Sequence, residues 1–284
     1  MNIKDVAVIG GGTMGNGIAH VFAQNGFEIL LVDVKSEYLD RALAQIQKNL
    51  ERQAKKGTTP HTTISKTMAR INPTVKLEEV EKADLVVEAI FENIAIKKEI
   101  FQRLDGICPE HTILASNSSS LPITAIASAT KRPSKVIGMH FMNPVPMMKL
   151  VELIRGIATS DDTFNIIKDL CLKLDKTPVE VNDYPGYISN RLLMPMINEA
   201  IYCLMEGIAK AEDIDTVMKL GMNHPMGPLT LADFIGLDVC LAIMEALYEG
   251  YADSKYRPCP LLKRMVQAGY LGKKTGRGFY NYQK

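Results

Sequence analysis

The sequence lacks the features that mark several special classes of protein. Its five cysteines are odd in number and lie far apart, with no CxxC pair. We therefore expect reduced thiols and no bound metal, not a disulfide framework or a zinc site. No apolar run reaches the ~18 residues that span a bilayer. The first predicted strand starts at Ile3, which leaves no room for a signal peptide, and a cytoplasmic location is the expectation.

An excess of charge of one sign is also missing. The 284 residues carry 33 Lys and Arg against 32 Asp and Glu, a net charge of +1. A nearly neutral chain gives no electrostatic reason to expect nucleic acid or a membrane as a partner. With 46% hydrophobic residues and no internal repeat, the composition is that of a globular protein of one large or two moderate domains.

A glycine-rich segment near the N-terminus is typical of dinucleotide binding. The apolar run 6–9 is followed by Gly10-Gly11-Gly12-Thr13-Met14-Gly15 and a helical stretch, and a second apolar run ends at Asp33. The GxGxxG pattern alone is weak evidence for dinucleotide binding, because a glycine turn without a ligand can match it. Here a strand precedes it, a helix follows it, and an acid lies 18 residues beyond the last glycine. Gly10 would permit the tight turn, and Gly12 would let the pyrophosphate approach the backbone at the helix N-terminus. Gly15 would permit close packing of the helix on the strand.

Asp33 is expected to select the cofactor. Its carboxylate would accept hydrogen bonds from the adenosine ribose hydroxyls and would repel a 2′-phosphate. At ~4 Å and an effective dielectric constant of ~20, that repulsion amounts to a few kcal/mol. The sequence therefore predicts NAD, with NADP disfavoured, although Lys35 could weaken the discrimination.

The stretch 36–56 predicts a long helix with a basic C-terminal part. Its cations are Lys48, Arg52, Lys55 and Lys56. One interpretation is a solvated face whose charges suit a helix C-terminus. The alternative is a binding site for an anionic part of the substrate.

A polar run follows the predicted strand 112–115. Its residues are Ser116-Asn117-Ser118-Ser119-Ser120. Because ligands gather beyond the carboxyl ends of strands in an open α/β sheet, this run is a candidate site. The other interpretation is a helix cap ahead of Pro122, and we expect at least one of these residues to cap.

The segment 136–154 carries a pair of side chains suited to proton transfer. Residues 136–139 predict a buried strand that delivers His140, and the apolar run 150–154 has Glu152 in its middle. A lone acid in such a run is costly to bury without a partner. If the turn Asn143-Pro144-Val145-Pro146 folds the second run back on the first, His140 and Glu152 meet. A strand-end histidine considered alone is more often structural.

The alternation of strands and helices up to residue 181 predicts a doubly wound, Rossmann-type α/β sheet. After Asp183 the pattern becomes helical, at 187–206, 211–220, 228–235, 237–248 and 260–268. We expect an NAD-binding Rossmann domain at 1–183 and an all-α C-terminal domain at 184–284. The many Met, Leu and Ile residues of the latter favour either a subunit interface or a plain core. The glycine-rich tail 272–280 gives no independent chemical argument.

Taken together, these stretches resemble the L-3-hydroxyacyl-CoA dehydrogenase family, most of all its single-function 3-hydroxybutyryl-CoA dehydrogenases. The similarity extends from the glycine segment to the tail 276–282, through the serine run and the segment 140–152. It also includes Pro185-Gly186-Tyr187-Ile188-Ser189-Asn190-Arg191. The similarity thus covers nearly the whole chain, and it implies a homodimer formed through the helical domain.

The resemblance also implies roles for individual residues. His140 would be the general base that takes the proton of the 3-hydroxyl of (S)-3-hydroxyacyl-CoA as hydride leaves for NAD⁺. Glu152 would orient the imidazole and stabilise the imidazolium, and Ser119 and Asn190 would hold the reacting oxygens of the substrate. Lys56 would contact the coenzyme A moiety. The expected cofactor contacts are Gly10, Gly12, Thr13, Met14, Gly15, Asp33, Glu92, Lys97, Asn117 and Asn143.

Two alternative hypotheses compete with this functional assignment. Dehydrogenases of the 6-phosphogluconate or 3-hydroxyisobutyrate type place a catalytic lysine on the first long helix of the second domain. Here that stretch reads Ser189-Asn190-Arg191-Leu192, without a lysine nearby. The other reading is a non-catalytic NAD-binding scaffold, since a fold does not fix a function. The sequence leaves acyl-chain length, pathway and oligomer size open.

Overall fold

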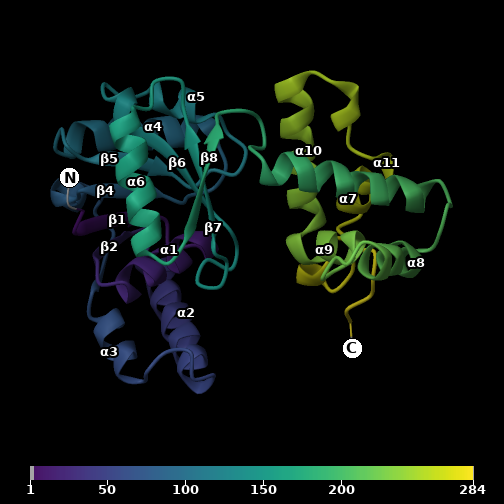
Figure 1. The fold of residues 1–284 in the computed structure, drawn as a ribbon, viewed down its shortest axis with the longest axis horizontal. Coiled ribbons are helices and arrows are strands. Elements are labelled where there is room, and N and C mark those ends of the chain that lie inside the picture. The colour runs from purple at the N-terminus through teal and green to yellow at the C-terminus, as the bar shows by residue number, and fades with distance from the viewer. Residues whose placement is uncertain (1–2, 284) are drawn as a thin grey trace. The chain divides into compact units, whose positions relative to one another are not determined.

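An eight-stranded sheet organises the first part of the chain (Figure 1). The computed structural model describes residues 3–283, in which the strand order is β3-β2-β1-β4-β5-β6-β7-β8. The strands are β1 (Asp5–Ile9), β2 (Glu28–Val32), β3 (Ile71–Thr74), β4 (Leu85–Glu88), β5 (Ile113–Ser116), β6 (Val136–Phe141), β7 (Leu150–Arg155) and β8 (Thr177–Asn182). β1 to β6 pair in parallel, whereas β7 is antiparallel to β6 and parallel to β8. The predicted doubly wound α/β sheet is confirmed.

Helices pack on both faces of this sheet. Alternate strand residues point to opposite faces, so each face presents side chains that the helices cover. Val6 and Val8 of β1 belong to a core cluster with Phe22, Ile46 and Ile167, which lie on three helices of one face. The helices of the first unit are α1 (Thr13–Gln24), α2 (Ser36–Lys55), α3 (Thr62–Met68), α4 (Ile94–Ile107), α5 (Ile123–Ala127) and α6 (Asp161–Lys173).

The opposite face of β6 packs against α5. A Cβ added to Gly138 would lie 3.0 Å from Cγ1 of Ile123 and 2.8 Å from Cβ of Ile154. His140 lies two residues beyond Gly138 on the same strand, so it points to this same face. The absence of a side chain at Gly138 therefore lets α5 approach the strand that carries His140.

The order of the strands creates a switch point beside β1. The chain runs outward from β1 through β2 to β3, then returns to β4 on the other side of β1. Ligands of open α/β sheets bind beyond the carboxyl ends of the strands at such a point. The glycine segment and the loop after Glu88 both begin there.

The chain divides into two compact units, Met1–Tyr184 and Pro185–Lys284. The second is helical, with α7 (Ser189–Met205), α8 (Ala211–Thr216), α9 (Pro228–Ile235), α10 (Leu237–Tyr251) and α11 (Pro260–Gln267). The predicted helix 211–220 begins as α8 and continues as a π-helix, Val217–Gly221. No helix within residues 3–283 has the length and apolarity to cross a bilayer.

The glycine-rich tail has a structural role in this second unit. Asp233 is 1% exposed and accepts hydrogen bonds from the backbone N–H groups of Phe279 and Tyr280, both at 2.9 Å. A Cβ on Gly278 would lie 1.9 Å from Oδ1 of Asp233, so only glycine permits this approach. Tyr280 also donates its hydroxyl to Asp215 at 2.9 Å. The tail therefore satisfies two buried acids.

Candidate active site

The glycine segment forms a tight turn between β1 and α1. Gly10 has φ +103°, and a Cβ there would lie 2.7 Å from the carbonyl oxygen of Ala89. A Cβ on Gly15 would lie 1.7 Å from the carbonyl oxygen of Gly10, so any side chain would push the helix away from the turn. Gly12, in contrast, has open space where a Cβ would be, as the approach of a ligand to the backbone requires.

The N-terminus of α1 is suited to an anion. Gly12 is its N-cap residue and supplies no side-chain cap to the first N–H groups of the helix, which begins with Thr13 and Met14. Uncapped N–H groups and the helix dipole favour a phosphate at this position. The residues here therefore fit the pyrophosphate of a dinucleotide.

Asp33 is held in place beside this turn. Its two carboxylate oxygens accept hydrogen bonds from the N–H groups of Gly11 and Val34, each at 2.6 Å. It lines a surface pocket of about 470 Å³ together with Tyr38 and Arg41 of α2. An acid fixed at the end of β2 matches the position that binds an adenosine ribose.

His140 and Glu152 meet across the two strands that the proline-rich turn connects. They are direct partners in the antiparallel register of β6 and β7, and Nδ1 of His140 lies 2.8 Å from Oε2 of Glu152. The side chains are 10% and 2% exposed, so the contact is largely shielded from water. If Nδ1 donates to the carboxylate, the lone pair of the neutral imidazole is on Nε2, which can then accept a proton.

Asn117 and the turn after β6 adjoin this pair. Oδ1 of Asn117 accepts a hydrogen bond from the N–H of Phe141 at 2.9 Å, which ties the end of β5 to the residue after His140. Lys176 is buried and donates to the carbonyl oxygens of Val145 and Met148 at 2.6 and 2.7 Å. These bonds fix the turn that carries Asn143, whose own side chain is exposed.

Glu92 organises the serine run. Its Oε1 accepts hydrogen bonds from the N–H groups of Ser119 and Ser120 at 2.8 and 3.0 Å and from the hydroxyl of Ser118 at 2.5 Å. Partial burial alone would raise the pKa of Glu92. The charge of Lys97 and the hydrogen bonds from these serines outweigh it and hold the pKa below its ordinary value. Glu92 is therefore an ionised anchor for the backbone around Ser119.

The predicted helix cap within the serine run is wrong. The N-terminus of α5 receives no side-chain cap from its N-cap residue, Pro122. Instead the N–H groups of Ile123 and Thr124 donate to the two carboxylate oxygens of Asp183, at 3.0 and 2.7 Å. Asp183 lies about sixty positions along the chain from α5, and a local sequence pattern cannot reveal such a cap.

Glu88, the last residue of β4, was not among the predicted site residues. Glu88 is 0% exposed and Lys97 is 1% exposed, and Nζ of Lys97 lies 2.6 Å from Oε1 of Glu88. A lone acid in the apolar run 85–90 is the same signal that singled out Glu152, so the sequence did contain a clue. Lys97, predicted as a cofactor contact, is thus part of a buried ion pair.

Two other predicted residues lie elsewhere in the structure. Lys56 is exposed at the C-cap of α2. Asn190 is 8% exposed in the first turn of α7 in the second unit, where its N–H donates to the carbonyl oxygen of Gly186 at 3.2 Å. Their contacts with a substrate stay predictions.

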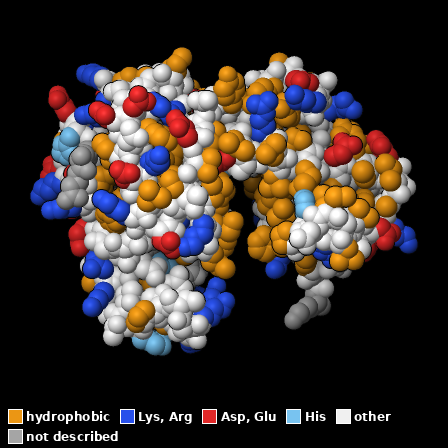
Figure 2. Space-filling model, in the orientation of Figure 1, with side chains coloured by type: hydrophobic (Ala, Val, Ile, Leu, Met, Phe, Trp, Pro, Cys, Tyr) orange, Lys and Arg blue, Asp and Glu red, His pale blue; other side chains and the backbone are white. Residues whose placement is uncertain are grey.

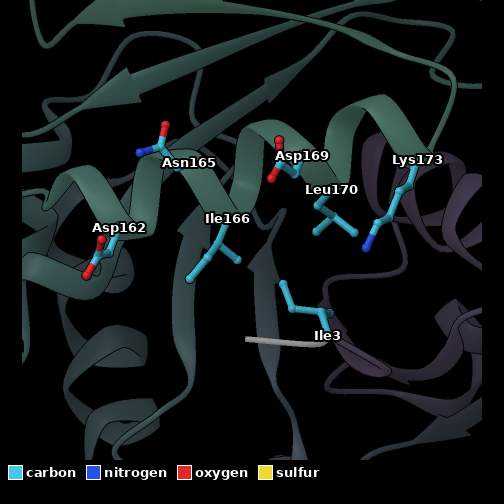
Figure 3. A pocket seen from close by; sticks show the side chains of 7 residues that line it. All are labelled: Ile3, Asp162, Asn165, Ile166, Asp169, Leu170 and Lys173. Carbon is cyan, nitrogen blue, oxygen red and sulfur yellow. The ribbon is translucent and has the colours of Figure 1, made fainter.

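A further surface pocket of about 390 Å³ lies against α6. Figure 3 shows six of its lining residues on that helix, from Asp162 to Lys173, with Ile3 facing them. None of the predicted site residues lines it.

Comparison with known proteins assigns both units to one family. Residues 5–184 match "3-hydroxyacyl-CoA dehydrogenase, NAD binding domain", and residues 186–282 match "3-hydroxyacyl-CoA dehydrogenase, C-terminal domain". The chain belongs to the 3-hydroxyacyl-CoA dehydrogenase family. The expected family, its NAD cofactor and an oxidoreductase activity on 3-hydroxyacyl-CoA are thereby confirmed.

Individual relatives agree with this assignment over nearly their whole lengths. A probable 3-hydroxybutyryl-CoA dehydrogenase of Bacillus subtilis is 60% identical, over 100% of this chain and 99% of the relative. The mitochondrial hydroxyacyl-coenzyme A dehydrogenase of Rattus norvegicus is 46% identical, over 99% and 92%. The crystal structure of (S)-3-hydroxybutyryl-CoA dehydrogenase from Ralstonia eutropha superposes with a TM-score of 0.96 at 48% identity, and 100% of each chain is covered.

Proposed function

We propose that this member of the family interconverts (S)-3-hydroxybutyryl-CoA and acetoacetyl-CoA, with His140 and Glu152 as the proton-transfer pair. The contact of 2.8 Å between a shielded imidazole and a buried carboxylate is the observation that carries the roles of the two residues. The short acyl chain is supported by the names of the relatives from Bacillus subtilis and Ralstonia eutropha.

The geometry of the pair supports these roles. NAD⁺, when bound, accepts the hydride that leaves C3 of the hydroxyacyl group. His140 takes the proton of the 3-hydroxyl at the same carbon and returns it when the reaction runs toward the alcohol. Glu152 keeps a proton on Nδ1 and stabilises the imidazolium that forms. A positioned base of this kind contributes about 10²–10⁴-fold in rate.

The remaining site residues divide between substrate and cofactor. Ser119 and Asn190 hold the reacting oxygens, and Lys56 contacts the coenzyme A moiety. The first unit, at 1–183, binds NAD through the glycine turn, Asp33 and the residues around Glu92, Asn117 and Asn143. The helical unit, at 184–284, binds substrate and forms the dimer. The support is the anchoring of Ser119 by Glu92 and of Asp33 by Gly11, at 2.8 and 2.6 Å.

The test is spectrophotometric. Purified protein is mixed with NADH and acetoacetyl-CoA, and absorbance at the NADH band is followed. The rate is then compared across longer 3-oxoacyl-CoA substrates and with NADPH. We expect NADH consumption with the highest kcat/KM for acetoacetyl-CoA. A flat trace with folded protein would favour the non-catalytic scaffold, and a preference for long chains would overturn the proposed substrate.

The dehydrogenases with a catalytic lysine are disfavoured by the second unit. Its first helix, α7 (Ser189–Met205), contains no lysine in its seventeen described residues. The protonatable pair that the structure does contain, His140 and Glu152, comes from the sheet of the first unit.

We infer that the protein is a homodimer formed through the helical unit. This unit exposes large apolar side chains, among them Leu192, Ile208, Val217, Leu220, Met222 and Phe234. Figure 2 shows one face of the molecule, on which hydrophobic side chains gather over this unit. A subunit interface is the ordinary use of such a surface. In sedimentation, Val217→Glu with Leu220→Glu should shift the dimer toward monomer, whereas Ile157→Glu in the first unit should not. A monomeric wild type would overturn the inference. A cytoplasmic location stays a prediction.

A further inference from the structure

Glu88 lies at the centre of a hydrogen-bond network that no proposed step of the reaction uses directly. Its Oε1 accepts from Nζ of Lys97 at 2.6 Å and from the N–H of Ile90 at 2.7 Å. Its Oε2 accepts from the hydroxyl of Ser116 at 2.7 Å. One carboxylate therefore joins the end of β5, the loop after β4 and the first turn of α4.

Burial of the Glu88 carboxylate costs hydration free energy, which an ion pair and hydrogen bonds must offset. Glu88 is 0% exposed, and a buried ion pair repays the loss of hydration only when its geometry is good and its other hydrogen bonds are satisfied. Both conditions hold here. An apolar pair of the same volume would often stabilise a fold as well, so stability alone gives no reason for these charges.

Lys97 passes the influence of Glu88 to Glu92. The ammonium group has three N–H donors, and besides Glu88 it lies 3.4 Å from Oε2 of Glu92 and 3.4 Å from the carbonyl oxygen of Ile90. Lys97 is only 1% exposed, so these groups surround it within the first unit. The contact with Glu88 therefore fixes the position of the Lys97 ammonium group, and the same group also faces the carboxylate of Glu92.

Two routes lead from Glu88 to the turn of Ser119. Through Lys97 it reaches Glu92, whose other oxygen accepts from the N–H of Ser119 at 2.8 Å. Through Ser116 it reaches the same turn again, because the hydroxyl of Ser116 accepts from the N–H of Ser118 at 3.2 Å. The first route ends at Ser119, which is predicted to hold a substrate oxygen, and the second ends at Ser118, the residue before it.

We propose that Glu88 is a positioning residue of the active site, which fixes Glu92 through Lys97 and the turn of Ser119 through Ser116. Lys97 links Glu88 to Glu92 in this network. The proposal rests on the proposed function, because it assigns the purpose of the network to the placement of Ser119 for the reaction.

The experiment compares Glu88→Gln, Lys97→Met and the double variant with a matched control. Asp105→Asn is the control, since Asp105 lies on the same helix as Lys97 and forms a shielded ion pair with Arg132 at 2.7 Å, away from the network. Glutamine keeps the shape of Glu88 and removes its charge. Kinetics are measured with NADH and acetoacetyl-CoA, and thermal unfolding is measured on the same samples.

We expect Glu88→Gln to lower kcat about 10- to 100-fold while KM for NADH changes less than about threefold, because a small displacement of a positioned group costs mainly rate. Asp105→Asn should keep kcat near wild type even if its Tm falls. A kcat of Glu88→Gln equal to that of the control would overturn the positioning role.

Thermal unfolding tests the link between the charges. Lys97→Met alone leaves the Glu88 carboxylate buried without its cation, so its Tm should fall more than that of the double variant. Additive falls in Tm would overturn the coupling. A wild type that binds NADH but does not turn over acetoacetyl-CoA would overturn the proposed function and the positioning role with it. An active wild type with an active Glu88→Gln overturns the positioning role alone.

Discussion

The imidazole of His140 faces the carboxylate of Glu152 directly across an antiparallel strand pair, with Nδ1 and Oε2 2.8 Å apart. Directly opposed residues of such a pair have neighbouring side chains on one face of the sheet. A slip of one residue in register would place one of the two side chains on the other face. The register of the two strands therefore sets which side chain His140 faces.

Loss of either member of this pair should lower the rate and spare cofactor binding. We expect His140→Gln and Glu152→Gln each to reduce kcat about 10²–10⁴-fold, with the Kd for NADH nearly unchanged. His111→Gln is the control, because His111 lies 3.4 Å from Asp84 in a comparable but exposed contact. Near-normal turnover in either site variant would contradict the roles assigned to the pair.

Cofactor choice should depend on Asp33. Asp33→Ala removes the charge that repels a 2′-phosphate, and Arg41, which lines the same pocket, can then attract it. We expect the ratio of kcat/KM for NADPH to that for NADH to rise about 10- to 100-fold, in line with a few kcal/mol of lost repulsion. Asp40→Ala, which removes an exposed acid of the same helix as Arg41, should leave the ratio unchanged.

His20 should make the fold sensitive to acid. It is 0% exposed on α1, and burial is the main cause that lowers its pKa to about 4. The unfolded chain takes up this proton near pH ~6.5, so between that pH and about 4 the unfolded state holds more protons than the folded one. Stability from this group is complete at neutral pH and falls by about 3 kcal/mol as pH drops through that window.

Urea unfolding at a series of pH values measures this effect. His20→Gln should flatten the decline of the free energy of unfolding between pH ~6.5 and about 4. An equally steep decline in the variant would show that other groups cause it.

Lys176 should stabilise the turn after β6. Lys176→Met leaves the carbonyl oxygens of Val145 and Met148 without their donor and should cost about 2–4 kcal/mol of folding free energy. Lys149→Met is the control. The side chain of Lys149 is 63% exposed and pairs with that of Asp175, which is 83% exposed, so its loss should cost less than about 1 kcal/mol. Equal losses in the two variants would contradict the importance of burial.

The parts of the site that could be predicted have local signals in the sequence. The glycine turn lies within one strand-turn-helix unit, and Gly15 is required there by its approach to Gly10. The meeting of His140 and Glu152 depends on two short apolar runs and one proline-rich turn, and all three are visible in order along the chain. Patterns of this kind predict structure because the contact partners are near in sequence.

The parts that were missed depend on contacts between distant residues or on loop geometry. Asp183 caps a helix sixty residues away, and no pattern near Pro122 indicates it. The pairing of Glu88 with Lys97 requires the loop after β4 to bring the first turn of α4 back over the end of that strand. The sequence shows an acid and a lysine nine positions apart but not the path of the loop.

The bonds between Asp233 and the tail have a consequence for the order of synthesis. Asp233 receives hydrogen bonds from Phe279, Tyr280 and the hydroxyl of Tyr282, more than forty residues later in the chain. The helical unit cannot satisfy this buried acid until those residues have left the ribosome. The sheet, by contrast, has all eight strands once Asn182 is made. Domains generally fold as units from the N-terminus during translation. The nucleotide-binding unit can thus fold before Phe279, Tyr280 and Tyr282, which the helical unit needs, have been synthesised.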